Sequence, residues 1–116
     1  MANLKMVTKE LINVDDLVGA LDSEILNVQA IDGFAFHIIC SGSMTVTAAL
    51  YGSCQHKDRA DFVPFMTLIT GSSSTIAAGA SLIIDAFVQK YRYAQIKLTA
   101  ASGTGNIEVW YNGKQN

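Results

Sequence analysis

Two runs of residues in the last quarter of the chain have a β-strand pattern and are separated by a short glycine-rich turn. The runs are Tyr91–Ala101 and Asn106–Asn112, and the turn between them has the sequence SGTG. Alternating polar and apolar residues on both sides of such a turn are typical of an antiparallel hairpin. We expect the apolar positions to pair across this hairpin, Ile96 with Tyr111, Leu98 with Val109 and Ala100 with Ile107.

A second hairpin is predicted earlier in the chain. Phe34–Cys40 alternates in hydrophobicity, Ser41–Ser43 supplies turn residues, and Val46–Leu50 alternates again. A pairing register is strongly specified when one face of a hairpin is buried, because a slip by one residue turns every side chain to the wrong face. The register that places all apolar residues on one face pairs Ile38 with Val46, Phe36 with Ala48 and Phe34 with Leu50.

The remaining segments also favour short strands. Pro64 cannot donate a hydrogen bond within a sheet, so we expect 61–70 to be an edge or bulged strand. Residues 81–89 form another strand, with Ile83 and Phe87 on the face opposite the main apolar set. Residues 1–30 are less regular, with strands possible at 9–14 and 24–30 and either a short helix or a loop at 15–24.

These patterns predict an all-β fold: a single antiparallel β-sandwich or jelly-roll-like barrel of about 7–8 strands, with a less regular N-terminal segment. Residues 1–30 are expected to form an N-terminal arm and the first strand or strands. Residues 31–116 are expected to form the sandwich, and the whole is one domain, as suits a chain of 116 residues.

The composition favours a chain that buries part of its surface against another chain. Half of the residues are apolar and only 16% are charged, where about 25% charged is typical of globular domains. The net charge is −2 and no basic stretch occurs, so we expect no nucleic-acid partner. The longest apolar region, Ile76–Ile84, is too short and too interrupted to span a bilayer, so we expect no membrane partner.

No catalytic constellation can be recognised in the sequence, and we expect no enzymatic activity, no cofactor and no metal. His37 and Cys40 are three residues apart on a predicted strand, so they point to opposite faces and cannot form a dyad. A metal site at His56 with the aspartates that follow it is the less favoured alternative to a solvated loop, because nothing fixes the ligand geometry. Cys40 and Cys54 lie far apart in the predicted hairpin, and we expect them to remain buried thiols.

The predicted C-terminal hairpin has aromatic residues on its less apolar face, and these are the candidate site residues. Tyr91, Tyr93 and Trp110 would share this face with Lys97. Tyrosine and tryptophan offer a large contact area at low entropic cost and often anchor interfaces. Two alternatives remain open: the rings stack on a sugar, or this face is the second side of the core with Lys97 at its margin.

The stretch from Tyr91 to Lys114, in which an aromatic-Arg-aromatic strand leads through SGTG to a strand ending in Gly-Lys, resembles the C-terminal hairpin of small tailed-phage virion proteins. Asp61–Phe65 resembles the strand that precedes it in these proteins. They are β-sandwich structural components that include capsid decoration, or cement, proteins. The resemblance covers about residues 30–114, and no catalytic residues come with it.

The resemblance implies a non-enzymatic virion structural protein that self-associates and decorates or cements a phage capsid. It further implies a homo-oligomer, with a trimer favoured, that contacts other virion proteins and is folded in the host cytoplasm before it enters the virion. The alternative function is a carbohydrate-binding β-sandwich module of a phage tail fibre or spike, for which the aromatic face would be the sugar site.

Overall fold

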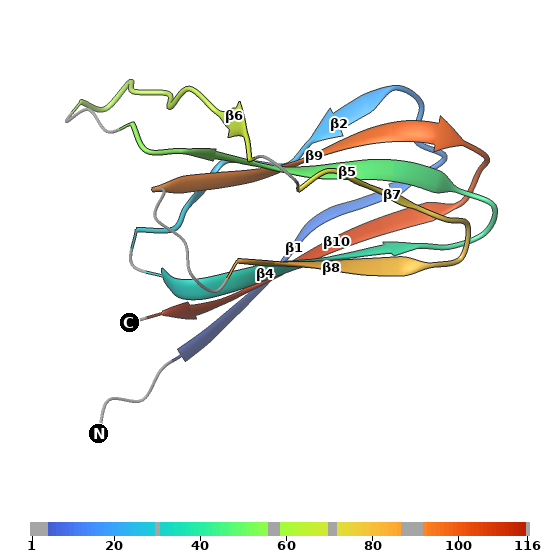
Figure 1. The fold of residues 1–116 in the computed structure, drawn as a ribbon, viewed down its shortest axis with the longest axis horizontal. Helices are drawn as coiled ribbons and strands as arrows, with labels where there is room; N and C mark the ends of the chain where they lie inside the picture. Colours follow the sequence, from blue (N-terminus) through green and yellow to red (C-terminus); the bar gives the residue numbers. More distant parts are fainter. Residues whose placement is uncertain (1–4, 30, 56–58, 70–71, 87–91, 116) are drawn as a thin grey trace.

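In a computed structural model of the chain, the strands form two antiparallel sheets packed face to face (Figure 1). The structure describes residues 5–29, 31–55, 59–69, 72–86 and 92–115. Strands are the only regular elements among these residues. The prediction of an all-β antiparallel sandwich is therefore confirmed.

Sheet A has four strands in the order β1-β10-β4-β8. The first and last strands of the chain are therefore neighbours in one sheet, and β10 lies between β1 and β4. A register shift between Glu10 and Ile12 places a bulge in β1. The strands of this sheet are β1 (Lys5–Asp15), β4 (Ile31–Cys40), β8 (Ser81–Ala86) and β10 (Asn106–Gln115).

Sheet B has six strands and is built around two long ones, β5 and β9. The main order is β2-β9-β5-β6, while β3 also pairs with β9 and β7 also pairs with β5. The strands at its margins have only two or three residues, which explains why the predicted number of strands is lower than the observed one. The strands are β2 (Ala20–Asp22), β3 (Leu26–Asn27), β5 (Thr45–Ser53), β6 (Thr67–Leu68), β7 (Ser74–Ile76) and β9 (Tyr93–Ser102).

Both predicted hairpins are wrong in their strand pairing. β4 pairs with β10 and β8, and β5 pairs with β9, so the turn after Cys40 carries the chain from one sheet to the other. The same holds for β9 and β10, which belong to sheet B and sheet A respectively. Ile38 lies opposite Val109 and Leu82, not Val46, and Leu98 lies opposite Leu21 and Ala48, not Val109.

The two connections that cross between the sheets pack against each other at one end of the sandwich. Backbone N–H groups of Ser41 and Ser43 donate to the carbonyl oxygens of Asn106 and Thr104, at 2.9 Å in both cases. Gly103 has a φ of +82°, and a Cβ added there would lie 2.0 Å from the carbonyl oxygen of Ser43. The glycine is therefore required both by its backbone conformation and by the close approach of the neighbouring turn.

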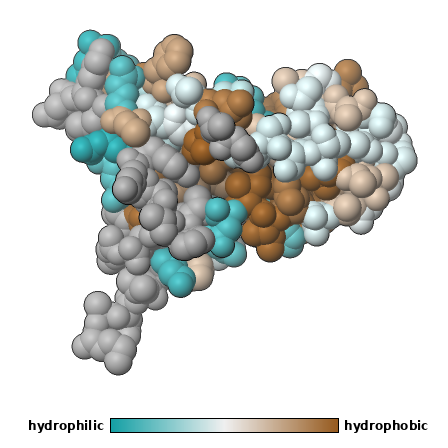
Figure 2. All heavy atoms as spheres, viewed as in Figure 1, coloured by the Kyte–Doolittle hydropathy of each residue, from teal (hydrophilic) through white to brown (hydrophobic). Residues whose placement is uncertain are grey.

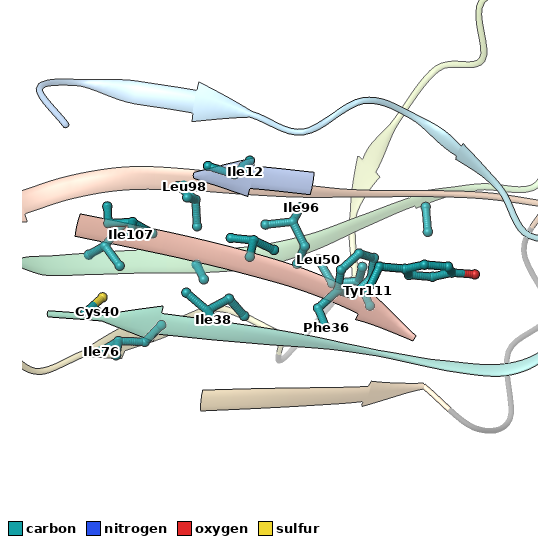
Figure 3. Packing of buried hydrophobic residues seen from close by; sticks show 14 of the residues in the cluster. Ile12, Phe36, Ile38, Cys40, Leu50, Ile76, Ile96, Leu98, Ile107 and Tyr111 are labelled. Atoms are coloured by element: carbon teal, nitrogen blue, oxygen red, sulfur yellow. The ribbon is translucent and has the colours of Figure 1, made fainter. Parts of the chain in front are cut away.

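The core lies between the sheets and is made of the apolar sets that the alternation predicts. Figure 3 shows Phe36, Ile38 and Cys40 of β4 facing Leu50, Ile96 and Leu98 of sheet B. At one end the rings of Phe34, Phe36 and Tyr111 pack together, with centroids 5.5–5.9 Å apart. The inward faces of the long strands were thus predicted correctly even though their partner strands were not.

Three further predictions can be compared with the structure. The segment 15–24 contains no helix: β1 continues to Asp15, and β2 follows a turn at Gly19 (φ +79°). Of the expected strand 61–70, only β6 is present, and it lies at the edge of sheet B. β8 (Ser81–Ala86) covers the first part of the expected strand 81–89, and Phe87 lies outside the described residues.

Candidate interaction surface

The outer face of sheet A carries a row of side chains that runs across all four strands. The register places Glu10 opposite Trp110, Trp110 opposite His37, and His37 opposite Ile83. Directly opposed residues in an antiparallel sheet project to the same face, with Cβ atoms about 4.5–5.5 Å apart. The row therefore places the indole of Trp110 at the centre of the sheet, flanked by a carboxylate on one side and an imidazole on the other.

Apolar side chains extend this row toward the edge of the sheet at β8. Ile83 is 60% exposed, and Ile39 and Trp110 are half-buried. No described strand covers this face, which is the lower side of the sandwich in Figure 1. A central tryptophan with aliphatic neighbours and charged residues at the margin has the composition of a protein interface, in which an aromatic anchor is surrounded by polar groups.

One end of the same face is hollowed. Gly33 and Ala35 on β4 have little or no side chain, while longer side chains on the neighbouring strands rise around them. The resulting depression has a volume of about 310 Å³ and is bordered by Met6, Asp85, Asn112 and Lys114. Such a hollow, with one acidic and one basic residue at its rim, is suited to receive a side chain of a partner.

The four candidate residues from the sequence do not form one face. Trp110 lies on the outer face of sheet A, whereas Tyr93 and Lys97 lie on the outer face of sheet B. Tyr91 lies outside the described residues. The prediction of a shared aromatic face is therefore wrong, because it depended on β9 and β10 being a hairpin. Tyr93 and Trp110 are each half-buried and neither belongs to the core cluster.

Lys97 is part of a small cluster on the outer face of sheet B. Its ammonium group lies 4.5 Å from the ring centroid of Tyr51 and 3.8 Å from a carboxylate oxygen of Asp22. Tyr93 is the first residue of β9, and its ring centroid is 6.3 Å from that of Phe62. The cation occupies a face of the Tyr51 ring, so this cluster is less available for stacking than Trp110 is.

A second exposed apolar area lies in the loop 59–66, which precedes β6. Val63 is 73% exposed and Phe65 is 77% exposed. The N–H of Phe65 donates a hydrogen bond to the side-chain oxygen of Gln55, two residues after β5, at 3.0 Å. The loop therefore presents two exposed apolar side chains beside sheet B, the opposite sheet from Trp110.

The titratable groups with shifted pKa values belong to the core. Burial raises the pKa of the Cys40 thiol and also that of the Tyr111 hydroxyl, because the charged form of each would lose its solvation. The side chains of Cys40 and His37 point to opposite faces of β4, as the sequence predicts. No disulfide joins Cys40 and Cys54, but Cys54 is exposed, and the expectation that it is buried is wrong.

Among the described residues, no group of three or more histidine, cysteine or carboxylate side chains is arranged to hold a metal ion. His56 and Asp58 of the alternative metal loop lie outside these residues. Within the same part of the chain, no helix has the length and apolar character needed to cross a membrane.

Comparison with known proteins identifies the fold but no family. No protein-family model matches the chain, and no curated protein sequence matches it significantly. Among solved structures, the SPBc2 prophage-derived protein YomS is 13% identical, with a TM-score of 0.63 and coverage of 99% of this chain and 97% of that one.

A second similar structure is that of Bacillus endospore appendages, described as a novel family of disulfide-linked pili. It is 15% identical, with a TM-score of 0.51 and coverage of 99% of this chain and 93% of that one. At these identities the likeness shows the fold. Two proteins that share this sandwich over nearly their whole length are thus a prophage-derived protein and a pilus protein.

Proposed function

We propose that the chain is a non-enzymatic structural protein of a phage virion that self-associates and decorates or cements the capsid. The observation that carries this proposal is the outer face of sheet A, where Trp110 stands in an uncovered row between Glu10 and His37 and leads to exposed Ile83. Burying such a face against a neighbouring subunit releases water from apolar surface, which favours association.

The comparisons and the composition support the same proposal. One structural neighbour derives from a prophage and another forms pili, which are assemblies of repeated subunits. The chain is poor in charge, with 16% charged residues. A low charge density suits a subunit whose faces are covered in an assembly. Weak contacts repeated over a particle surface would stabilise the shell through multivalency.

In this proposal the protein folds in the host cytoplasm and then enters the virion, where it contacts copies of itself and other virion proteins. The expected trimer rests on the resemblance to virion proteins. The described surfaces give two candidate contacts, the outer face of sheet A and the edge at β8. Neither of these favours a three-fold arrangement over a two-fold one.

The test combines light scattering of the purified chain with co-sedimentation on empty tailed-phage capsids. We expect an oligomer in solution, or capsid binding that Trp110→Ala abolishes. The exposed residue Thr99, on the outer face of sheet B, supplies the matched control Thr99→Ala, which should bind as the wild type does. A monomer that ignores capsids at all concentrations would contradict the proposal.

The alternative, a carbohydrate-binding module of a tail fibre or spike, is favoured by one observation. The half-buried ring of Trp110 lies on an outer sheet face opposite His37 and two residues along β10 from Asn112, which borders the hollow. Aromatic rings on such faces stack on sugars. A glycan array probed with the wild type and with Trp110→Ala separates the two functions, because only a sugar module gives hits that depend on this ring.

A further inference from the structure

Sheet A has two edges, and within the part of the chain that the structure describes, only one of them is protected against pairing with another strand. β1 carries a bulge between Glu10 and Ile12 and the charged side chains of Lys9, Glu10 and Asp15. Bulges and charges are the means by which natural proteins keep edge strands from pairing. β8 has neither a bulge nor a proline, and Asp85 is its one charged residue.

The edges of sheet B are short instead. β2, β3, β6 and β7 have two or three residues each, which limits the number of hydrogen bonds that another strand could form with them. Among the described strands, β8 therefore stands out as a six-residue, apolar and regular edge. Figure 2 shows a hydrophobic band in the region that β8 occupies in Figure 1.

The backbone groups on the outer side of β8 can be identified from the hydrogen bonds of β4. The N–H of Cys40 donates to the carbonyl oxygen of Ala80 at 3.0 Å, while the N–H of Ser41 donates toward β10. Antiparallel pairs alternate between bonded and non-bonded. Leu82 and Ile84 therefore bond to β4, and the N–H and C=O groups of the residues between and beside them, Ser81, Ile83 and Asp85, point away from the sheet.

We propose that β8 pairs in antiparallel orientation with β8 of a second copy of this chain, about a two-fold axis at Ile83. The inference rests on the self-association proposed above and identifies the edge of β8 as the surface through which two copies associate. Sheet A would continue from one sandwich into the other. Ile83 would face Ile83 of the second copy, and the bonded pairs of the new ladder would each exchange both of their N–H···O bonds.

The sequence of β8 is complementary to itself in this register. The Ser81 hydroxyl comes opposite the Asp85 carboxylate and can donate a hydrogen bond to it, and Leu82 comes opposite Ile84 on the inner face. A register centred on Ile84 would instead place Ile83 against Asp85, an apolar residue against a charge. Cross-strand pairs of matching character stabilise a sheet, so the Ile83-centred register is favoured.

This pairing also extends the interaction surface described above. The row of Glu10, Trp110, His37 and Ile83 ends at the free edge, so a two-fold axis at Ile83 continues it into the same row of the second copy. The two Trp110 rings would then lie on one continuous face of the joined sheet. A six-residue edge is a small contact, and we expect a dimer that forms with rising protein concentration rather than an obligate one.

The first test is sedimentation velocity of the full chain over a concentration series. Ile83→Lys places a charge on the edge without disturbing the core, because Ile83 is 60% exposed, and it should weaken dimerisation by about tenfold or more. Val18→Lys is the matched control, since Val18 is 90% exposed and lies away from β8, and the substitution also replaces an exposed β-branched apolar side chain by the same charge. It should dimerise like the wild type.

The second test fixes the register by disulfide formation in a Cys54→Ser background. Mixing Ser81→Cys and Asp85→Cys chains under mild oxidation should give covalent dimers, and Ile83→Cys alone should do the same. Ser81→Cys alone should not, because two copies of residue 81 are not opposed. Cross-linking between Ile83→Cys and Asp85→Cys chains in preference to these pairs would overturn the register.

The outcomes separate this inference from the proposed function. Oligomers that form equally well with Ile83→Lys and give no cross-link through β8 overturn the β8 pairing and leave self-association standing. A wild type that stays monomeric, while Ile83→Lys weakens its binding to capsids, overturns pairing with a second copy and assigns the edge to another virion protein. A monomer without capsid binding overturns both.

Discussion

Trp110 on β10 lies directly opposite His37 on β4, and both side chains project from the outer face of sheet A. The relationship exists because β10 is inserted between β1 and β4, which makes Trp110 a central residue of the sheet and not the end of a C-terminal hairpin. A central position gives a ring neighbours on both sides. These neighbours restrict the orientation of the indole, so less side-chain conformational entropy is lost when a partner binds it.

We predict that Trp110→Ala reduces the binding of capsids much more than it reduces stability. The ring is half-buried on an outer face, so its loss should lower the free energy of unfolding by about 1 kcal/mol, the scale of a cross-strand contact. Urea denaturation measures this change. Tyr93→Ala, on the opposite outer face, is the control and should bind capsids as the wild type does. Equal losses of binding for both variants would mean that binding does not depend specifically on the outer face of sheet A.

The two crossing connections give a prediction about stability. Gly103→Ala should lower the free energy of unfolding by about 3 kcal/mol or more, because the new Cβ would lie 2.0 Å from a backbone oxygen of Ser43 at a φ of +82°. Gly19 has nearly the same φ, +79°, but nothing within 4 Å of an added Cβ. Gly19→Ala should therefore lower the free energy of unfolding by only about 1–2 kcal/mol, because only the unfavourable positive φ of alanine contributes.

Thermal or urea denaturation of the two glycine variants measures this difference. Equal losses of stability at Gly19 and Gly103 would mean that the two crossing connections do not pack against each other as described.

The sequence allowed the faces of the strands to be predicted but not their partners. Alternation with a period of two identifies which residues point inward, and Phe36, Ile38, Ile96 and Leu98 are indeed buried. The same alternation is satisfied by a hairpin and by a chain that crosses to a facing sheet, because in both cases the apolar side chains meet in the core. The turn sequences at 41–43 and 102–105 suit either connection.

What decides between these two connections is a contact between the turns themselves, which are about sixty residues apart in the chain. The hydrogen bonds of Ser41 and Ser43 to Asn106 and Thr104 satisfy the backbone of both turns at once. No local pattern records such a contact. For the same reason the row through Trp110 was missed, since Glu10, His37 and Ile83 come from three separate segments. The alternation did place Ile83 on the face of 81–89 opposite the main apolar set, and apolar residues on both faces indicated burial on both faces, whereas Ile83 is 60% exposed in the single chain.

The two cysteines should differ in their reactivity. Cys40 is buried and its pKa is raised, so little thiolate is present and reagents cannot reach it, whereas Cys54 is exposed. We expect a thiol reagent such as dithionitrobenzoate to modify Cys54 rapidly in the folded protein and Cys40 only on unfolding. The variant Cys54→Ser should lose the rapid phase and keep the slow one, and a rapid phase that survives this substitution would place Cys40 at the surface.

Stability should fall at alkaline pH because of groups in the core. Burial raises the pKa values of Tyr111 and Cys40 in the folded protein, so the folded state holds these protons more tightly than the unfolded chain does. Their contribution is then fully present below the unfolded-state pKa values and is lost as the pH rises from these values through the raised folded-state pKa values. Through these two groups, the free energy of unfolding should decrease above about pH 8.5.

Urea denaturation at a series of pH values measures this slope, and two variants assign it. Tyr111→Phe and Cys40→Ala should each make the alkaline decrease shallower, because each removes one of the titrating groups from the core. Thr99→Ala, on the outer face of sheet B, removes no titrating group; it is the control and should leave the slope as it is in the wild type. If the alkaline decrease in both core variants is as steep as in the wild type, neither group is harder to deprotonate in the folded state than in the unfolded chain.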